Sequence, residues 1–183
     1  MGREFVTSDT HFGHRNVLNF CPTTRPYNTV EEMDDDIIRI WNTHVRPHDT
    51  VYHLGDVSFA NPTQTREIVE RLNGNIHLIT GNHDSKTIKS CSDQFQSIQE
   101  YVTIKRNKQR IILFHFPIVF WHSMEHGSIH LFGHMHGDYR PTGRNIDVGW
   151  DVFQRPVELT TLIEMINERP IEQRREKKEG NNE

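Results

Sequence analysis

Cysteine is scarce in this sequence, and its two cysteines stand at no recognisable spacing. Cys21 and Cys91 match no zinc-binding or redox pattern, so we expect two free thiols and a reducing, cytoplasmic environment. A secretory start, a myristoylation pattern and any apolar run of about 18 residues are also missing. These absences argue against a disulfide-stabilised secreted domain and predict that the protein does not associate with membranes.

A surplus of positive charge is missing as well. Lysine and arginine number 21 against 25 aspartate and glutamate residues, which gives a formal net charge of −4. We therefore expect no broad nucleic-acid-binding surface, and the sequence indicates no particular oligomeric state. A nucleotide substrate is compatible with this balance, because bound divalent metal ions would add positive charge locally.

What the sequence has in excess is histidine, with 13 residues in a chain of 183. Histidine titrates near neutral pH and is a common metal ligand, so this excess indicates chemistry at a site. The length favours one domain with a hydrophobic core, which we assign to residues 1–171. Residues 172–183 contain no apolar side chain, and we predict a charged, disordered tail there.

Local patterns predict an α/β protein. A capping box opens a helix at Thr29, and an Asn61–Pro62 pair opens a second. Apolar spacing indicates a third helix over residues 159–168, and a polar turn within residues 101–114 predicts a hairpin. Strands and helices alternate early in the chain and strands dominate later, which favours a mixed sheet.

Residues that commonly bind metals follow five short apolar segments, each of which has the pattern of a β-strand. The five motifs are Asp9-Thr10-His11, Gly55-Asp56, Gly81-Asn82-His83-Asp84, His115 and Gly133-His134-Met135-His136. In open α/β sheets the functional loops gather at the carboxyl ends of the strands. We therefore expect the five motifs to share one site.

These residue types suit a pair of divalent metal ions. Asp9 and His11 are separated by one residue, so in an extended segment both point to the same side. His134 and His136 have the same spacing. A carboxylate such as Asp56 has two oxygens and can bridge two cations. Mixed nitrogen and oxygen ligands without thiolate favour Mn²⁺, with Fe, Zn, Ni or Co as alternatives. A single structural zinc ion is another hypothesis, but such sites favour cysteine and four ligands.

Two metal ions about 4 Å apart would polarise a phosphoryl group and hold a nucleophilic hydroxide between them. His83, beside Asn82, would then be free to act as general acid toward the leaving oxygen. Asp84 is expected to orient the His83 ring through its second nitrogen. His14, three residues after His11, is a candidate for contact with the substrate phosphate, with a plain surface histidine as the alternative.

In this order the motifs resemble those of the calcineurin-like metallophosphoesterases, and they span residues 9–136. The resemblance implies two mixed β-sheets packed as a sandwich and flanked by helices, in four αββα layers. It implies that His83 is the catalytic histidine. The implied metal ligands are Asp9, His11, Asp56 and His136 for one ion, and Asp56, Asn82, His115 and His134 for the other.

Departures from the family pattern narrow the activity. Protein Ser/Thr phosphatases of the family carry Asp-Arg-Gly after the second motif, whereas this sequence has Asp56-Val57-Ser58. The small size is similar to that of compact bacterial, archaeal and phage members, several of which cleave phosphodiesters. We therefore expect a phosphodiesterase acting on a small or nucleotide substrate. The alternatives are a phosphomonoesterase or nucleotide pyrophosphohydrolase, and a protein-binding scaffold, which the presence of His83 disfavours.

Overall fold

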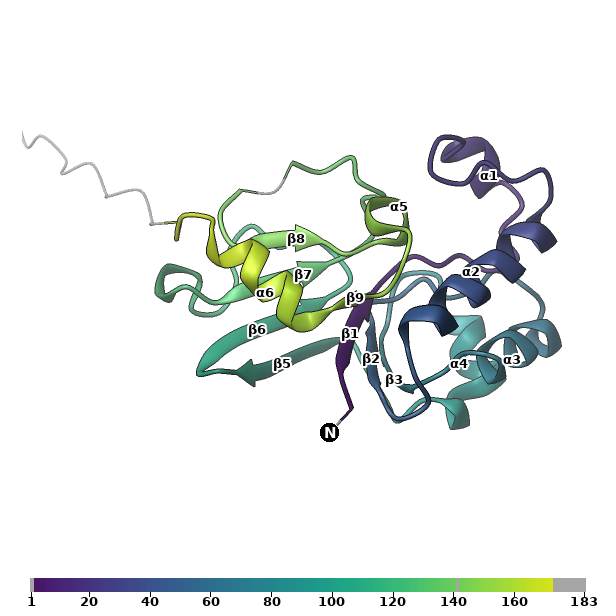
Figure 1. The fold of residues 1–183 in the computed structure, drawn as a ribbon, viewed down its shortest axis with the longest axis horizontal. Helices are drawn as coiled ribbons and strands as arrows, with labels where there is room; N and C mark the ends of the chain where they lie inside the picture. Colours follow the sequence, from purple (N-terminus) through teal and green to yellow (C-terminus); the bar gives the residue numbers. More distant parts are fainter. Residues whose placement is uncertain (1, 141, 173–183) are drawn as a thin grey trace, which may run out of the picture.

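Two mixed β-sheets form the centre of the molecule (Figure 1). The computed structural model describes residues 2–140 and 142–172. The first sheet has the order β4-β3-β2-β1-β9, in which β1 to β4 run parallel and β9 runs antiparallel. Its strands are β1 (Glu4–Thr7), β2 (Thr50–His53), β3 (Asn75–Ile79), β4 (Ser97–Gln99) and β9 (Val157–Glu158).

The second sheet follows chain order. It contains β5 (Tyr101–Arg106), β6 (Gln109–Phe114), β7 (Ile129–Phe132) and β8 (Asn145–Asp147). β5 and β6 are antiparallel, and the remaining pairs are parallel. Asn107 and Lys108 join β5 to β6 with φ angles of 49° and 66°, as in tight two-residue hairpin turns. The predicted hairpin is confirmed, with a shorter turn than the four polar residues suggested.

Six α-helices and two 3₁₀ turns lie between or after the strands within the described residues. They are α1 (Val17–Phe20), α2 (Val30–His44), α3 (Pro62–Glu70), α4 (Ser85–Cys91), α5 (Trp150–Phe153) and α6 (Leu159–Asn167), with 3₁₀ turns at Ser92–Gln94 and Met124–His126. The predicted starts of α2 and α3 are confirmed. Thr29 Oγ1 accepts a hydrogen bond from Glu32 N at 3.1 Å, and Asn61 Oδ1 accepts one from Gln64 N at 3.0 Å. The third predicted helix is α6.

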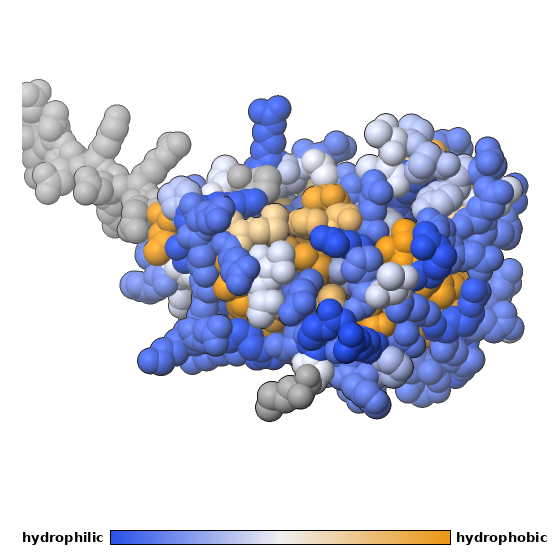
Figure 2. All heavy atoms as spheres, in the orientation of Figure 1, coloured by the Kyte–Doolittle hydropathy of each residue, from blue (hydrophilic) through white to orange (hydrophobic). Residues whose placement is uncertain are grey.

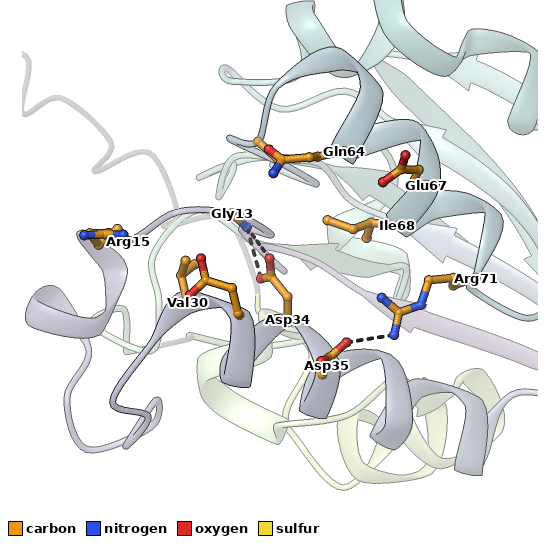
Figure 3. Close-up of a pocket in the computed structure, with 11 residues that line it drawn as sticks. Gly13, Arg15, Val30, Asp34, Asp35, Gln64, Glu67, Ile68 and Arg71 are labelled. Carbon is orange, nitrogen blue, oxygen red and sulfur yellow. Dashed lines mark hydrogen bonds and ion pairs between the residues drawn. The ribbon is translucent and has the colours of Figure 1, made fainter.

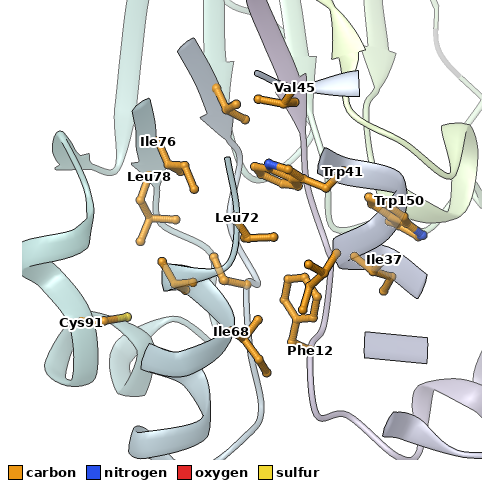
Figure 4. Close-up of a cluster of buried hydrophobic side chains, with 14 of the residues drawn as sticks. Phe12, Ile37, Trp41, Val45, Ile68, Leu72, Ile76, Leu78, Cys91 and Trp150 are labelled. Carbon is orange, nitrogen blue, oxygen red and sulfur yellow. The ribbon is translucent and has the colours of Figure 1, made fainter. Parts of the chain in front are cut away.

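The first sheet separates two hydrophobic cores, because successive side chains of a strand point to opposite faces. Phe5 and Val51 pack toward the helices, in a cluster with Ile37 and Trp41 of α2 (Figure 4). Val6 of the same strand packs on the other face, in a cluster shared with the second sheet and α6. The predicted fold of two mixed sheets with flanking helices is therefore confirmed.

The remaining expectations concern the surface and the chain end. Cys21 and Cys91 are free. Among the described residues, no helix combines the length and the apolar character needed to cross a lipid bilayer. The face seen in Figure 2 is mostly hydrophilic, with separate hydrophobic patches. Residues 173–183, which make up nearly all of the predicted charged tail, lie outside the described residues.

Candidate metal centre

The five motifs begin just after the carboxyl ends of strands from both sheets. β1 leads to Asp9, β2 to Asp56, β3 to Asn82, β6 to His115 and β7 to His134. Parallel strands bring their carboxyl ends to one edge of a sheet, and the two sheets pack face to face. The candidate ligands therefore gather into two groups of close residues, one around Asp9 and one around Asp56.

Asp9, His11 and His136 form the first ligand group, with one ligand atom of each within 4.8 Å of the others. Asp9 Oδ1 lies 3.6 Å from His11 Nε2, and neither atom has a hydrogen-bond partner among the described residues. Buried polar atoms are rarely left unpaired, so this pair suits a cation. Burial would raise the pKa of Asp9, but the neighbouring histidines, chiefly His11, lower it to about 2, which keeps the carboxylate ionised.

Asp56, His115 and His134 form the second ligand group, also within 4.8 Å. His115 Nδ1 donates to the Leu54 carbonyl at 2.7 Å, because a carbonyl oxygen only accepts. The Nε2 atom of His115 is then an acceptor, as in metal-bound histidines. It lies 3.0 Å from the Asn82 Oδ1 atom. Two acceptors this close suit a shared cation, so Asn82 joins the second group.

Asp56 stands between the two groups. Its Oδ2 atom lies 3.9 Å from His11 Nε2 of the first group and 3.6 Å from His115 Nε2 of the second. Its Oδ1 atom accepts a hydrogen bond from His83 N at 2.9 Å. The Oδ2 oxygen is thus in position to contact an ion in either group. The donor set as a whole fits two divalent ions.

Left-handed backbone is concentrated at the candidate ligands. The φ angles are 55° at Asp9, 52° at His11, 57° at Asp56, 70° at His134 and 47° at His136. Each such residue costs about 1–3 kcal/mol unless its surroundings impose it. Here Asp9 N donates to the Gly55 carbonyl at 2.9 Å, and His11 N donates to the Asp56 carbonyl at 3.1 Å. The extended geometry that we expected for each Asp-x-His or His-x-His pair is wrong. Asp9 and His11 still converge on the first ligand group, whereas His136 belongs to the first group and His134 to the second.

Two motif glycines leave no room for a side chain. A Cβ atom on Gly133 would lie 2.1 Å from Ser8 Oγ and 2.3 Å from Asp9 Oδ2. A Cβ atom on Gly81 would lie 2.3 Å from Asp56 Oδ1. Glycine at these positions therefore permits the close approach of the backbone to the carboxylates of the candidate ligands Asp9 and Asp56.

Asp84 makes different contacts from those expected. Its buried carboxylate accepts hydrogen bonds from three backbone amides, Asp56 N at 2.8 Å, Val57 N at 2.9 Å and Gly81 N at 2.8 Å. These bonds tie the loop after β2 to the loop after β3. In place of the expected orientation of the His83 ring, Asp84 holds the backbone of a candidate ligand.

His83 lies at the open side of the site. Its side chain is exposed, while its backbone N–H is fixed by Asp56. The His83 ring centroid lies 6.5 Å from that of His11 and 4.7 Å from that of Phe59. The imidazole is therefore beside the candidate ligands and accessible to a substrate.

Phe59 contacts the rings of three histidines at the site, and no sequence motif marked it as a site residue. The Phe59 ring stacks on His14 at 4.0 Å with an interplanar angle of 13°, and on His11 at 5.2 Å. Burial, followed by the neighbouring charges of His11 and Arg25, lowers the pKa of His14 to about 4. His14 is thus neutral at pH 7, and its contact with substrate stays a prediction.

A buried ion pair between Arg25 and Asp151 lies behind the first ligand group. No local sequence pattern predicted it. The Arg25 guanidinium donates to both carboxylate oxygens of Asp151 at 2.9 Å. It also donates to the backbone carbonyls of Asp9 at 2.6 Å and Thr10 at 2.8 Å. His136 Nδ1 lies 2.7 Å from Asp151 Oδ2, so Nδ1–H donates to the carboxylate and leaves Nε2 for a metal ion. Arg25 and Asp151 thereby position two candidate ligands.

Asp151 also belongs to a third set of close residues, with Cys21 and His136. This set is a poor metal site, because Arg25 and Thr24 already donate to the Asp151 oxygens. Burial would raise the pKa of Asp151, but His136 and then Arg25 hold it well below its usual range. Its chemistry fits an ion-pair partner that stays charged.

A cavity of about 430 Å³ lies between α2 and α3 and is also lined by Gly13 (Figure 3). Its acidic side chains are partly paired: Asp34 accepts from Gly13 N, and Asp35 forms an ion pair with Arg71. None of the candidate metal ligands lines it. It is separate from the metal centre.

Known proteins resemble this chain over most of its length. Residues 4–145 match the model of the calcineurin-like phosphoesterase superfamily domain. An uncharacterised protein of Methanocaldococcus jannaschii is 32% identical over 176 residues, which cover 91% of this chain and 92% of that protein. The gene 66 protein of Mycobacterium phage L5 is 25% identical over 203 residues, which cover 91% of this chain and 95% of that protein. The solved structure of a protein of unknown function from Aquifex aeolicus is similar in fold, with a TM-score of 0.72 at 23% identity, over 91% of this chain and 100% of that one.

Proposed function

Because this chain belongs to the calcineurin-like phosphoesterase superfamily, we propose that it is a phosphodiesterase with two divalent metal ions, acting on a small or nucleotide substrate. The position of Asp56 carries this proposal. One carboxylate oxygen lies 3.9 Å from His11 Nε2 and 3.6 Å from His115 Nε2. Such a carboxylate supports a bridged metal pair, which is the arrangement of many phosphoester hydrolases.

The proposed ions would take their ligands from both groups. When bound, they would polarise the phosphoryl oxygens and supply a water of lowered pKa as nucleophile. Mn²⁺ is the ion we propose first, because the donors are imidazole nitrogen and carboxylate or amide oxygen. The first ion would be held by Asp9, His11, Asp56 and His136, and the second by Asp56, Asn82, His115 and His134.

His83 is the proposed proton donor. Its backbone is fixed by Asp56 Oδ1 at 2.9 Å, and its side chain is exposed. A protonated His83 ring would give its proton to the leaving oxygen as the bond to phosphorus breaks. The alcohol would then leave as a neutral molecule.

The charge around the site supports a diester rather than a monoester. Among the described residues that line the cavity beside the ligands, there is no lysine or arginine. Arg25 is buried and paired with Asp151, so it is not available to a substrate. A phosphate monoester carries about one more negative charge than a diester near neutral pH. The described residues that line this cavity therefore offer no lysine or arginine to pair with that additional charge.

Hydrolysis of bis-p-nitrophenyl phosphate, compared with p-nitrophenyl phosphate, tests the proposal. With added Mn²⁺ we expect faster cleavage of the diester, and we expect EDTA to abolish it. Faster cleavage of the monoester would favour a phosphomonoesterase. Protein that holds two ions and cleaves neither compound would favour a protein-binding scaffold.

A further inference from the structure

A cavity of about 370 Å³ lies beside the metal ligands. His11 and His136 of the first ligand group line it on one side, and Val17 and Phe20 of α1 line it on another. Its volume is within the range of small-molecule sites. Because the cavity shares these histidines with the metal centre, a group that fills it would lie next to the phosphorus of a bound ester.

The cavity has an exposed aromatic wall. Phe20 is 72% exposed, and it belongs to α1, which lies at one end of the molecule, apart from both sheets (Figure 1). The Phe20 ring lies edge-on to His14 at 6.2 Å, and His14 in turn stacks on Phe59 at 4.0 Å. An accessible ring held in this way is a stacking surface for a flat aromatic group.

The charges of the cavity suit a nucleobase better than a second phosphate. Among the described residues that line it, Asp138 is the one carboxylate, and there is no lysine or arginine. A carboxylate accepts hydrogen bonds, so Asp138 can pair with the amino group of a base. The same carboxylate would repel a phosphate group.

The aromatic stack separates this cavity from the proton donor. His14 lines the cavity, whereas His83 does not. The Phe59 ring contacts both, with centroid distances of 4.0 Å to His14 and 4.7 Å to His83. The leaving alcohol has to lie within reach of His83. The group in the cavity is therefore the one that stays on phosphorus.

We propose that this cavity is a nucleobase subsite for the half of the phosphodiester that keeps the phosphate. The inference rests on the proposed phosphodiesterase function. In the reaction, the oxygen of water forms a bond to phosphorus and the bond from phosphorus to the leaving oxygen breaks. The leaving oxygen takes the proton of His83, which the proton from water replaces. The products are a nucleoside monophosphate, with its base in the cavity, and a free alcohol.

Binding to Mn²⁺-loaded protein, measured by calorimetry, tests the subsite without turnover. AMP and ribose 5-phosphate share sugar and phosphate, and they differ by the base. Stacking of one base is worth about 5- to 150-fold in affinity, so the wild type should bind AMP at least about fivefold more tightly. Phe20→Ala should bring the two affinities within about twofold of each other. Equal affinities in the wild type would overturn the subsite.

Phe120→Ala is the matched control, because Phe120 is 68% exposed and does not line this cavity. It should keep the wild-type preference for AMP. If Phe20→Ala also keeps the full preference, Phe20 is not the stacking surface and the inference fails. Circular dichroism checks that both variants fold, which is expected because both side chains are exposed.

The products of a mixed diester test the orientation. Adenosine 5′-(methyl phosphate) has two alkyl leaving groups of similar basicity. We expect AMP and methanol, whereas adenosine and methyl phosphate would contradict the assignment. If bis-p-nitrophenyl phosphate is not cleaved but AMP retains its base-dependent advantage, the subsite is supported and the phosphodiesterase proposal fails.

Discussion

At the scale of single residues, we expect turnover to depend on His83, the proposed proton donor. Replacing His83 with alanine would remove that donor and leave the side chains of the candidate metal ligands in place. We expect kcat for bis-p-nitrophenyl phosphate to fall by about 100- to 10,000-fold, with unchanged metal content. His48→Ala, at an exposed histidine before β2, is the control. Wild-type turnover in His83→Ala would remove the proton-donor role.

Asp34 allows a residue-scale prediction about pH. Burial raises the pKa of this carboxyl from 3.8 to about 6, although Gly13 N donates to both of its oxygens at 3.0 Å. A raised pKa means that the fold favours the neutral acid. The stability that Asp34 contributes is therefore present below pH 3.8 and is lost as the pH rises to about 6.

Asp34→Asn keeps an oxygen acceptor for Gly13 and removes this titration. Relative to the wild type, the variant should gain roughly 2 kcal/mol in the free energy of unfolding between acidic and neutral pH. Urea unfolding of both proteins at about pH 4 and above pH 7 measures the difference. An equal difference at the two pH values would show that Asp34 does not titrate as described.

At the scale of elements, the Arg25–Asp151 pair ties the segment before α2 to α5 and to the loop after β1. Arg25→Met should leave the buried Asp151 carboxylate without its guanidinium partner, although Thr24 and His136 still contact it, and we expect a loss of about 3–5 kcal/mol in the free energy of unfolding. The double variant Arg25→Met/Asp151→Leu should lose less than Arg25→Met alone, because no unpaired charge remains. Urea unfolding of the double variant and of both single variants tests this coupling. If the losses of Arg25→Met and Asp151→Leu simply add in the double variant, the two residues are not a coupled pair.

The elements also show which features can be predicted from the sequence. Thr29 and Asn61 use local capping rules, so the starts of α2 and α3 are readable within a few residues. The five motifs could be placed after strands because the short apolar strand patterns before them are also local. α1, α4 and α5 span 4, 7 and 4 residues, which is too short for a helical period to appear.

Features that depend on long-range contacts could not be predicted from the sequence. Arg25 and Asp151 are 126 residues apart, and no local pattern links a buried arginine to its partner. The left-handed backbone of Asp9 and His11 is imposed by hydrogen bonds to the loop after β2. The residue types at the site were therefore predictable, whereas the contacts that position them were not.

At the scale of the whole molecule, metal binding should be linked to stability. The candidate ligands come from loops after β1, β2, β3, β6 and β7, so ions that bind the folded state would join both sheets. One ion at 100 times its Kd adds about 2.7 kcal/mol to the free energy of unfolding. Calorimetry should give a higher Tm with Mn²⁺ than with EDTA. Identical Tm values would argue against binding at these loops.

The claim of a bridged metal pair is tested most directly by counting metal ions. Elemental analysis of protein loaded with Mn²⁺ and then desalted should give two ions per chain for the wild type. Asp56→Asn should give fewer than one, because the Asp56 carboxylate is proposed to bind both ions. One ion per chain in the wild type, or the loss of a single ion in Asp56→Asn, would contradict the bridged pair.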